Sequence, residues 1–142
     1  MSYTNNDKAA KFTKIEIGFF ARPSKQWKGK NMNIINSGKE QDYLIVSVEG
    51  RMDAVTTPEF EQKLGGWIDE GEIRFIVDFA GLGYISSAGL RGILTSVKRL
   101  KAEGGQIGLT SLHGTVKEVF EISGFSTIIP IYESVEAALQ EM

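Results

Sequence analysis

The sequence has no cysteine and a single histidine, His113. Without cysteine the chain forms neither disulfides nor a thiolate nucleophile, which fits a reducing cytoplasm. One imidazole is too few for a histidine-based metal site, so we expect neither a metal nor a cofactor. No run of about 18 uncharged apolar residues occurs either, and we expect no membrane span. The polar beginning, MSYTNNDKAAKF, lacks the apolar centre of a signal peptide, and we expect none there.

Negative charge is scarce in the first part of the chain. Residues 1–31 carry seven Lys or Arg against two Asp or Glu, a net +5, and residues 32–142 carry nine against sixteen, a net −7, which together give −2. A basic leader on an acidic domain is not the pattern of a nucleic-acid-binding protein. The 142 residues, 42% of them apolar, suffice for one domain with a core. We therefore expect an N-terminal extension, residues 1–31, and one domain, residues 32–142.

Apolar patterning predicts strands that alternate with helices. NIIN and YLIVSV, with SGKEQD between them, predict a hairpin. Segments typical of strands lie at residues 33–36, 43–48, 73–79, 106–110 and 127–132, and segments typical of helices at residues 56–71, 86–103, 116–125 and 134–142. This order indicates an α/β fold with parallel strand pairs. In the leader, KIEIGFF either forms an added edge strand or simply precedes the domain.

Two local patterns predict where elements begin and end. Thr56, with Glu59 three residues later, predicts a capping box at the start of a helix. The inner face of that helix is expected to carry Phe60, Leu64, Trp67 and Ile68. Gly81 and Gly83 follow a strand-like run and are expected to lie in a turn.

The stretch GYISSAGLRGIL, residues 83–94, joins the end of a strand to the start of a helix. One of Ser86 and Ser87 is expected to be the N-cap, whose side-chain oxygen accepts an amide proton of the first turn. Ala88 and Gly89 keep that turn small, so that a partner can approach the backbone closely. A bare helix N-terminus also favours negative charge, so a phosphate on a serine is tolerated here.

The residues around these serines do not support catalysis. Acyl transfer needs a positioned base with an acid behind it, and the chain has one histidine. The nucleophile-elbow pattern Gly-x-Ser-x-Gly requires a glycine where Ile85 stands. No glycine loop is followed by Gly-Lys-Ser/Thr, so the phosphate-binding P-loop is absent as well. We expect a binding protein, not an enzyme.

Three segments resemble one known family. DFAGLGYISSAGLRGIL resembles the signature of the STAS domain, as in bacterial anti-sigma factor antagonists, where a (D/S)-S-(S/T/A)-G-L segment opens a helix. EGRMDAVTTPEFE resembles the family's G-x-(L/M)-D loop, and GGQIGLTSLHGTVKEVFEISGFSTIIPIYESVEAAL resembles its usual end. The resemblance spans residues 32–142. It implies a STAS-like α/β domain whose mixed, mostly parallel sheet of about four or five strands packs against about four helices.

The resemblance implies a regulatory protein without catalysis of its own. Antagonists of this family bind an anti-sigma factor, often a serine kinase of the ATPase fold, and thereby release a sigma factor for transcription. Phosphorylation of one serine by that kinase ends the binding, and a serine phosphatase restores it. By motif, Ser87 is the acceptor and Ser86 stands where many members have Asp. Asp53 matches the aspartate of the other loop, which lies beside the phosphorylation site.

The resemblance places partner-binding residues at Asp53, Ser86, Ser87, Ala88 and Gly89. Arg91, one turn into the helix, is either a further partner contact or a solvated side chain. A monomer is the expectation, and pairing through KIEIGFF is the alternative that gives a dimer. Two other functions stay open: a STAS subunit of a membrane transporter complex, and a signalling or ligand-binding module that is not phosphorylated.

Overall fold

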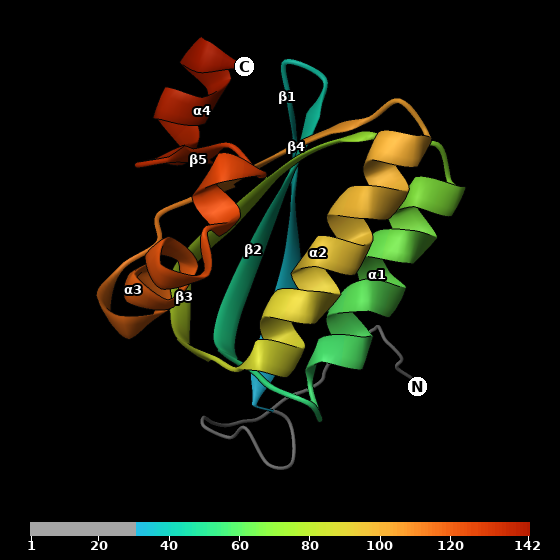
Figure 1. Cartoon of the computed structure of the whole chain (residues 1–142). Helices are drawn as coiled ribbons and strands as arrows, with labels where there is room; N and C mark the ends of the chain where they lie inside the picture. The colour runs from blue at the N-terminus through green and yellow to red at the C-terminus, as the bar shows by residue number, and fades with distance from the viewer. Residues whose placement is uncertain (1–30) are drawn as a thin grey trace, which may run out of the picture. The chain divides into compact units, whose positions relative to one another are not determined.

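The structure is a computed structural model that describes residues 31–142. After an initial hairpin, helices and strands alternate along the chain (Figure 1). The strands are β1 (Met32–Glu40), β2 (Tyr43–Met52), β3 (Arg74–Ile85), β4 (Gln106–Thr110) and β5 (Ile131–Tyr132). The helices are α1 (Thr57–Asp69), α2 (Ser87–Ala102), α3 (Gly114–Ser123) and α4 (Val135–Glu141), with a short 3-10 turn, η2 (Phe125–Thr127), after α3. The predicted KIEIGFF strand lies outside the described residues.

The five strands form one sheet in the order β1-β2-β3-β4-β5. β1 and β2 are antiparallel, whereas the other neighbouring strands are parallel. The predicted α/β fold with a mixed, mostly parallel sheet is therefore confirmed.

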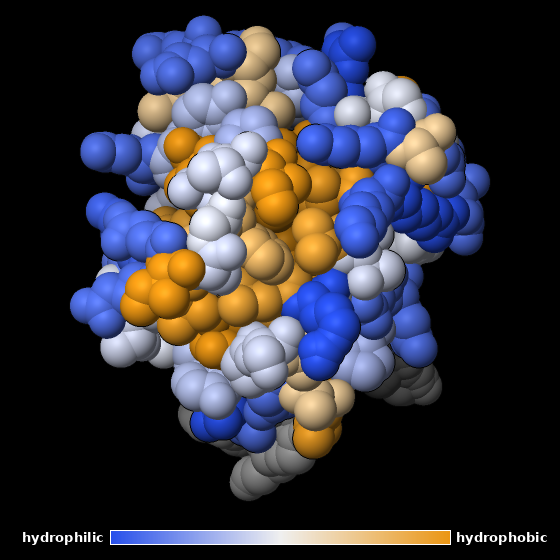
Figure 2. All heavy atoms as spheres, in the orientation of Figure 1, coloured by the Kyte–Doolittle hydropathy of each residue, from blue (hydrophilic) through white to orange (hydrophobic). Residues whose placement is uncertain are grey.

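The core lies mainly on one face of this sheet, beneath α1, α2 and α3. Fully buried side chains join the helices to the strands there; they include Phe60, Leu64, Ile93, Val97 and Phe120. Each such side chain contributes about 1.5–3 kcal/mol on leaving water. A smaller cluster on the other face packs α4 against β2 and β3 through Tyr43, Ile45, Ile76 and Ala138. Figure 2 shows apolar surface gathered between α2 and α3 in the view of Figure 1.

The hairpin between β1 and β2 has a tighter turn than predicted. Only Gln41 and Asp42 connect the strands, and both have positive φ, 53° and 72°. A type I′ turn requires this, because its twist then matches that of the strands. Residues 37–40, expected in the loop, instead extend β1 after a register shift between Asn36 and Lys39.

β3 is longer than predicted, and the turn expected at Gly81 and Gly83 is wrong. Both glycines lie inside the strand, which pairs with β2 as far as Ile85. Two register shifts each give β3 one extra residue relative to β2, the signature of β-bulges. A Cβ on Gly81 would lie 2.7 Å from Cγ of Glu49, so glycine here permits the close approach of β2. The bulges keep Phe79 and Leu82 in the core.

The capping box predicted at Thr56 is also wrong. Its hydroxyl makes no cap hydrogen bond and instead donates to the carbonyl oxygen of Arg51, at 2.8 Å. The helix itself is confirmed, with Phe60, Leu64 and Ile68 buried and Trp67 only partly buried.

The later elements follow the predicted order with different lengths. α2 has Glu103 as its C-cap, α3 has Gly124 as its C-cap with φ of 77°, and Ser134 caps α4, each within a residue of the predicted helix limits. The strand expected at 127–132 keeps only Ile131 and Tyr132, because η2 extends to Thr127 and residues 128–130 form a turn and irregular chain.

α1 and α2 lie side by side and run in the same direction, so their first turns share one end of the domain (Figure 1). Arg99 joins the far ends of the two helices. Its guanidinium pairs with Asp69 of α1 and with Glu103, and it donates to the carbonyl oxygen of Gly65 at 3.5 Å. The end that carries the serines is therefore built on two helices tied together.

Candidate functional site

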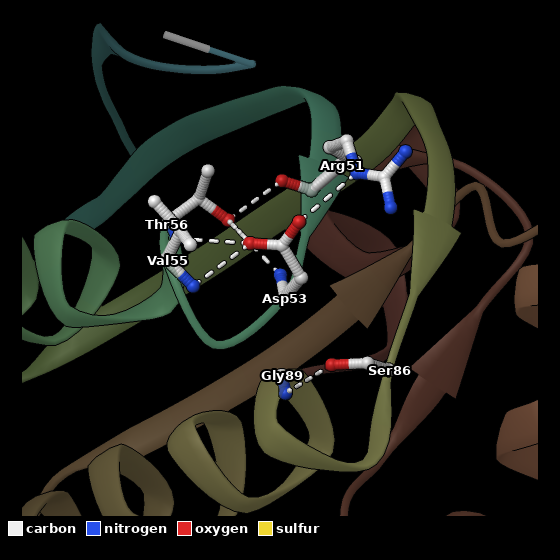
Figure 3. A network of polar contacts seen from close by, with 6 residues as sticks. All are labelled: Arg51, Asp53, Val55, Thr56, Ser86 and Gly89. Carbon is white, nitrogen blue, oxygen red and sulfur yellow. Dashed lines mark hydrogen bonds and ion pairs between the residues drawn. The ribbon is translucent and has the colours of Figure 1, made fainter. Parts of the chain in front are cut away.

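The ends of β2 and β3 bring the predicted site residues together. Arg51 pairs with Tyr84 and Met52 with Ile85 in the parallel register. The chain then leaves both strands at the same edge, and the N–H of Ser86 donates to the carbonyl oxygen of Met52 at 2.9 Å. The loop that holds Asp53 and the start of α2 are thus joined by a backbone hydrogen bond. Figure 3 shows the loop residues and the two residues Ser86 and Gly89 from close by.

Asp53 organises the loop before α1. Its Oδ1 accepts from the backbone N–H groups of Val55 and Thr56, both at 3.0 Å, and its Oδ2 accepts from Nε of Arg51 at 3.0 Å (Figure 3). The N–H of Asp53 in turn donates to the Thr56 hydroxyl at 3.0 Å. This is an Asx turn closed by a second side chain, which fixes the loop without a regular element.

Hydrogen bonding holds the pKa of Asp53 below its ordinary value. The backbone N–H of Thr56 is the main cause, opposed by desolvation and supported by Arg51 and the N–H of Val55. The Arg51 guanidinium also lies over the Tyr84 ring, 4.5 Å from its centroid, as in a cation–π contact. The carboxylate is therefore charged near neutral pH and fixed in place.

The two serines differ in their contacts. Ser86 is the N-cap of α2, and its Oγ accepts from the N–H of Gly89 at 3.3 Å. Ser87 is the first residue of the helix and is exposed. Among residues 31–142 no hydrogen bond involves its hydroxyl. Ser86 therefore caps the N-terminus of α2, and the side chain of Ser87 remains accessible.

The structure explains the glycine at position 89 differently from the sequence, which suggested close approach of a partner. It is buried rather than open to a partner, and a Cβ there would lie 2.9 Å from the Met52 carbonyl oxygen and 2.7 Å from Cγ1 of Ile85. Glycine lets α2 start directly on the end of β2. Ala88 is half-buried, and Arg91 is exposed, as expected.

Three residues of this end were not singled out from the sequence. Arg51 and Tyr84 become neighbours only through the register of β2 and β3. Thr57 is 4% exposed, and its hydroxyl has no partner in the part of the chain that the structure describes. No spacing in the sequence identifies a threonine whose hydroxyl is buried without a partner.

Within the described range we also looked at the single histidine, at clusters of possible metal ligands and at long apolar helices. His113 lies at the start of α3, where its Nε2 is 2.8 Å from the carbonyl oxygen of Ala80. Residues 31–142 contain no cluster of three or more His, Cys, Asp or Glu with metal-binding geometry. In the same range, no helix combines the length and the apolar character needed to span a bilayer.

Known proteins are similar to this chain in sequence and in fold. Residues 35–138 match the family model described as the STAS domain. The candidate anti-sigma factor antagonist BtrV of Bordetella bronchiseptica is 42% identical over 95 residues, which cover 67% of this chain and 82% of that protein. An anti-sigma factor antagonist from Mycobacterium paratuberculosis has a solved structure that matches with a TM-score of 0.68 at 23% identity, over 77% of this chain and 92% of that one. The phosphorylated form of the Bacillus cell fate determinant SpoIIAA matches with a TM-score of 0.60 at 20% identity, over 76% and 97%.

The fold and the site define the class of protein: a mixed-sheet α/β domain of the architecture seen in anti-sigma factor antagonists, with an exposed serine at the start of its second helix. The chain belongs to the STAS-domain family.

Proposed function

We propose that this chain is an anti-sigma factor antagonist that acts by partner switching in the cytoplasm. It binds an anti-sigma factor that is also a serine kinase of the ATPase fold, and this binding releases a sigma factor. The chain contributes no catalysis. Membership of the STAS family and the names of similar proteins, BtrV among them, support the proposal.

One observation carries it: Ser87 is exposed at the start of α2, and Ser86 makes the cap instead. In the proposed transfer, the Ser87 Oγ attacks the γ-phosphorus of ATP held by the kinase. The bond from that phosphorus to the bridging oxygen breaks, ADP leaves, and the hydroxyl proton passes to a base of the kinase. No hydrogen bond among residues 31–142 has to break for Ser87 to react.

The proposed switch depends on charge. A phosphate adds about −1.5 to −2 charges at neutral pH. Burying that charge against a partner without matching cations costs several kcal/mol. A loss of about 4 kcal/mol weakens binding roughly a thousandfold, without any refolding. A serine phosphatase then restores the binding state.

Phosphosite mapping tests the proposal. The full chain is incubated with Mg-ATP and a kinase-active lysate of its source cells, and mass spectrometry then locates the phosphate. We expect it on Ser87, absent from Ser87→Ala and retained in Ser126→Ala, a control that removes an exposed serine of η2. No phosphate on Ser87 would argue for an antagonist without phosphorylation or for a transporter subunit.

The isolated kinase gives a second measurement. In titration calorimetry we expect Ser87→Ala to bind it like the wild type and Ser87→Asp to bind more weakly, because only the latter adds charge. Equal affinities of the two variants would contradict the switch.

A further inference from the structure

A hollow of about 260 Å³ lies between α3 and the end of the sheet formed by β4 and β5, in the part of the chain drawn orange to red in Figure 1. Six of the side chains that line it, three apolar and three charged, are Leu112, Phe120, Ile131, Lys117, Glu121 and Glu133. None of its lining residues belongs to the loop of Asp53 or to α2. This α3–β5 hollow is therefore distinct from the candidate site around Ser87.

The hollow lies where the topology of the sheet favours a ligand. β4 and β5 are parallel neighbours, so their carboxyl ends meet at one edge, and Leu112 and Glu133 lie within two residues of these ends. The helix after β4, α3, packs on the face that carries the main core, whereas the helix after β5, α4, packs on the other face. In open α/β sheets, ligands bind in the crevice that forms where successive helices pass to opposite faces. The position of the hollow therefore indicates a binding site rather than a packing gap.

The size and the floor of the hollow fit a small apolar group. Pockets for drug-sized ligands measure about 300–1,000 Å³, and this hollow is slightly smaller. Phe120 is fully buried beneath it, with its ring centroid 6.4 Å from that of Phe79 in β3 and 5.9 Å from that of Phe125. Leu112 and Ile131 are only partly buried. A floor held in place by aromatic packing thus offers apolar contact to a ring or a short alkyl chain.

The charge around the hollow selects the polar end of a ligand. Residues 118–142 contain five Glu and no Lys or Arg, so Lys117 is the last cationic side chain of the chain. Glu121 and Glu133 stand against this one lysine, and none of the three forms an ion pair within residues 31–142. Glu121 also lies in the last turn of α3, where the carbonyl end of the helix is negative. The resulting potential attracts a cation and disfavours an anion.

We infer that the α3–β5 hollow binds a small molecule that carries a protonated primary amine on an apolar body. The apolar body rests on Phe120, and the ammonium group donates hydrogen bonds to the carboxylates of Glu121 and Glu133. An ammonium group has three donors and no acceptor, so it suits two carboxylates that come from different elements. This inference goes beyond the proposed function and does not depend on it, because the binding requires neither a partner protein nor a phosphate.

The probe is 2-phenylethylamine, which joins a primary amine to an aromatic body. It is titrated into the full chain at constant pH and salt, and amide chemical shifts are followed by NMR. We expect saturable shifts at residues 112–121 and 131–133, with a dissociation constant on the order of 1 mM for so small a ligand. Ammonium chloride supplies the charge without the body, and 3-phenylpropionate supplies the body with the opposite charge. No saturation with 2-phenylethylamine, or equal binding of either control, overturns the inference.

Two substitutions test the carboxylates of the hollow. We expect Glu121→Gln and Glu133→Gln each to weaken binding of 2-phenylethylamine about three- to tenfold, because each keeps the shape and removes one charge. Glu118→Gln is the matched control, since it removes the same charge from an exposed position of α3 that does not line the hollow, and it should bind like the wild type. Amide spectra without the probe verify that all three variants are folded.

The variants also separate a specific site from a general effect of charge. Equal weakening in all three variants would show that only the net charge of the domain acts on the amine. Unchanged binding in both Glu121→Gln and Glu133→Gln would show that these carboxylates are not its ligands. Either result overturns the inference, and neither bears on partner switching through Ser87.

Discussion

Replacing Gly89 by alanine tests how closely α2 is seated on the end of β2. The new Cβ would lie 2.9 Å from the carbonyl oxygen of Met52, 2.7 Å from Cγ1 of Ile85 and 3.0 Å from Cβ of Met52. Ile85 can adjust, but the Met52 carbonyl cannot, because it also accepts from the N–H of Ser86. The first turn of α2 must therefore move away from β2.

The expected cost follows from two opposing effects. Alanine is better than glycine within a helix by up to about 1 kcal/mol. Overpacking of a filled site costs about 1–3 kcal/mol, and here the obstacle is backbone rather than a flexible side chain. We expect the free energy of unfolding to fall by about 1–2 kcal/mol, measured by urea denaturation with an unchanged slope.

A matched substitution in α1 provides the control for Gly89→Ala. Gly66 is exposed in the helix, and a Cβ there meets nothing within 4 Å. Gly66→Ala should therefore stabilise the domain by about 0.5–1 kcal/mol, since only the helix propensity changes. A Gly89→Ala protein as stable as Gly66→Ala would refute the close seating of α2 on Met52.

Two further substitutions test the polar contacts of the site. Because the pKa of Asp53 is lowered in the folded state, its contribution to stability is complete above the ordinary pKa of about 4 and is lost as the pH falls through the folded value. Asp53→Asn should therefore be less stable than the wild type near neutral pH and should approach its stability in acid. Thermal unfolding of both proteins across this pH range measures the difference, and parallel pH profiles would contradict the expectation. Ser86→Ala should lose the cap and lower the free energy of unfolding by about 1 kcal/mol, whereas Ser86→Asp keeps an acceptor oxygen and should be as stable as the wild type. Urea denaturation measures both variants, and equal losses would show that Ser86 does not act through its acceptor oxygen.

Most of the fold could be predicted because it depends on local patterns. The core positions of α1 and the end of α3 at Gly124 follow from periodicity and from one residue that tolerates positive φ. The strand continuing through Gly81 and Gly83 could not be predicted, since glycines after an apolar run are typical of a turn. The approach of Glu49 on β2 explains the glycine at position 81, whereas a Cβ on Gly83 would meet only the Gly50 carbonyl oxygen, at 3.9 Å.

The candidate site also has features that the sequence predicts and features that it does not. That one serine would cap α2 follows from residue type, but which of the two does so is decided by the hydrogen bond from Gly89 to Ser86. Thr56 has the spacing of a cap, yet its hydroxyl donates to the carbonyl oxygen of Arg51, and the N–H of Glu59 donates to the Thr56 carbonyl oxygen instead of to the hydroxyl. Both competitions are between groups within five residues of one another, and residue type and spacing alone do not decide which group bonds to which.

The ties between α1 and α2 have a consequence for signalling. Arg99 joins the helices at one end, and the contact of Thr57 with Gly92 closes them at the other. A surface held in this way has little conformational freedom to lose when a partner arrives. In the proposed switch, phosphorylation therefore changes partner binding through charge rather than through a change of shape. The rate of switching is set by the enzymatic addition and removal of phosphate and by the lifetime of the complex, not by any rearrangement of this domain.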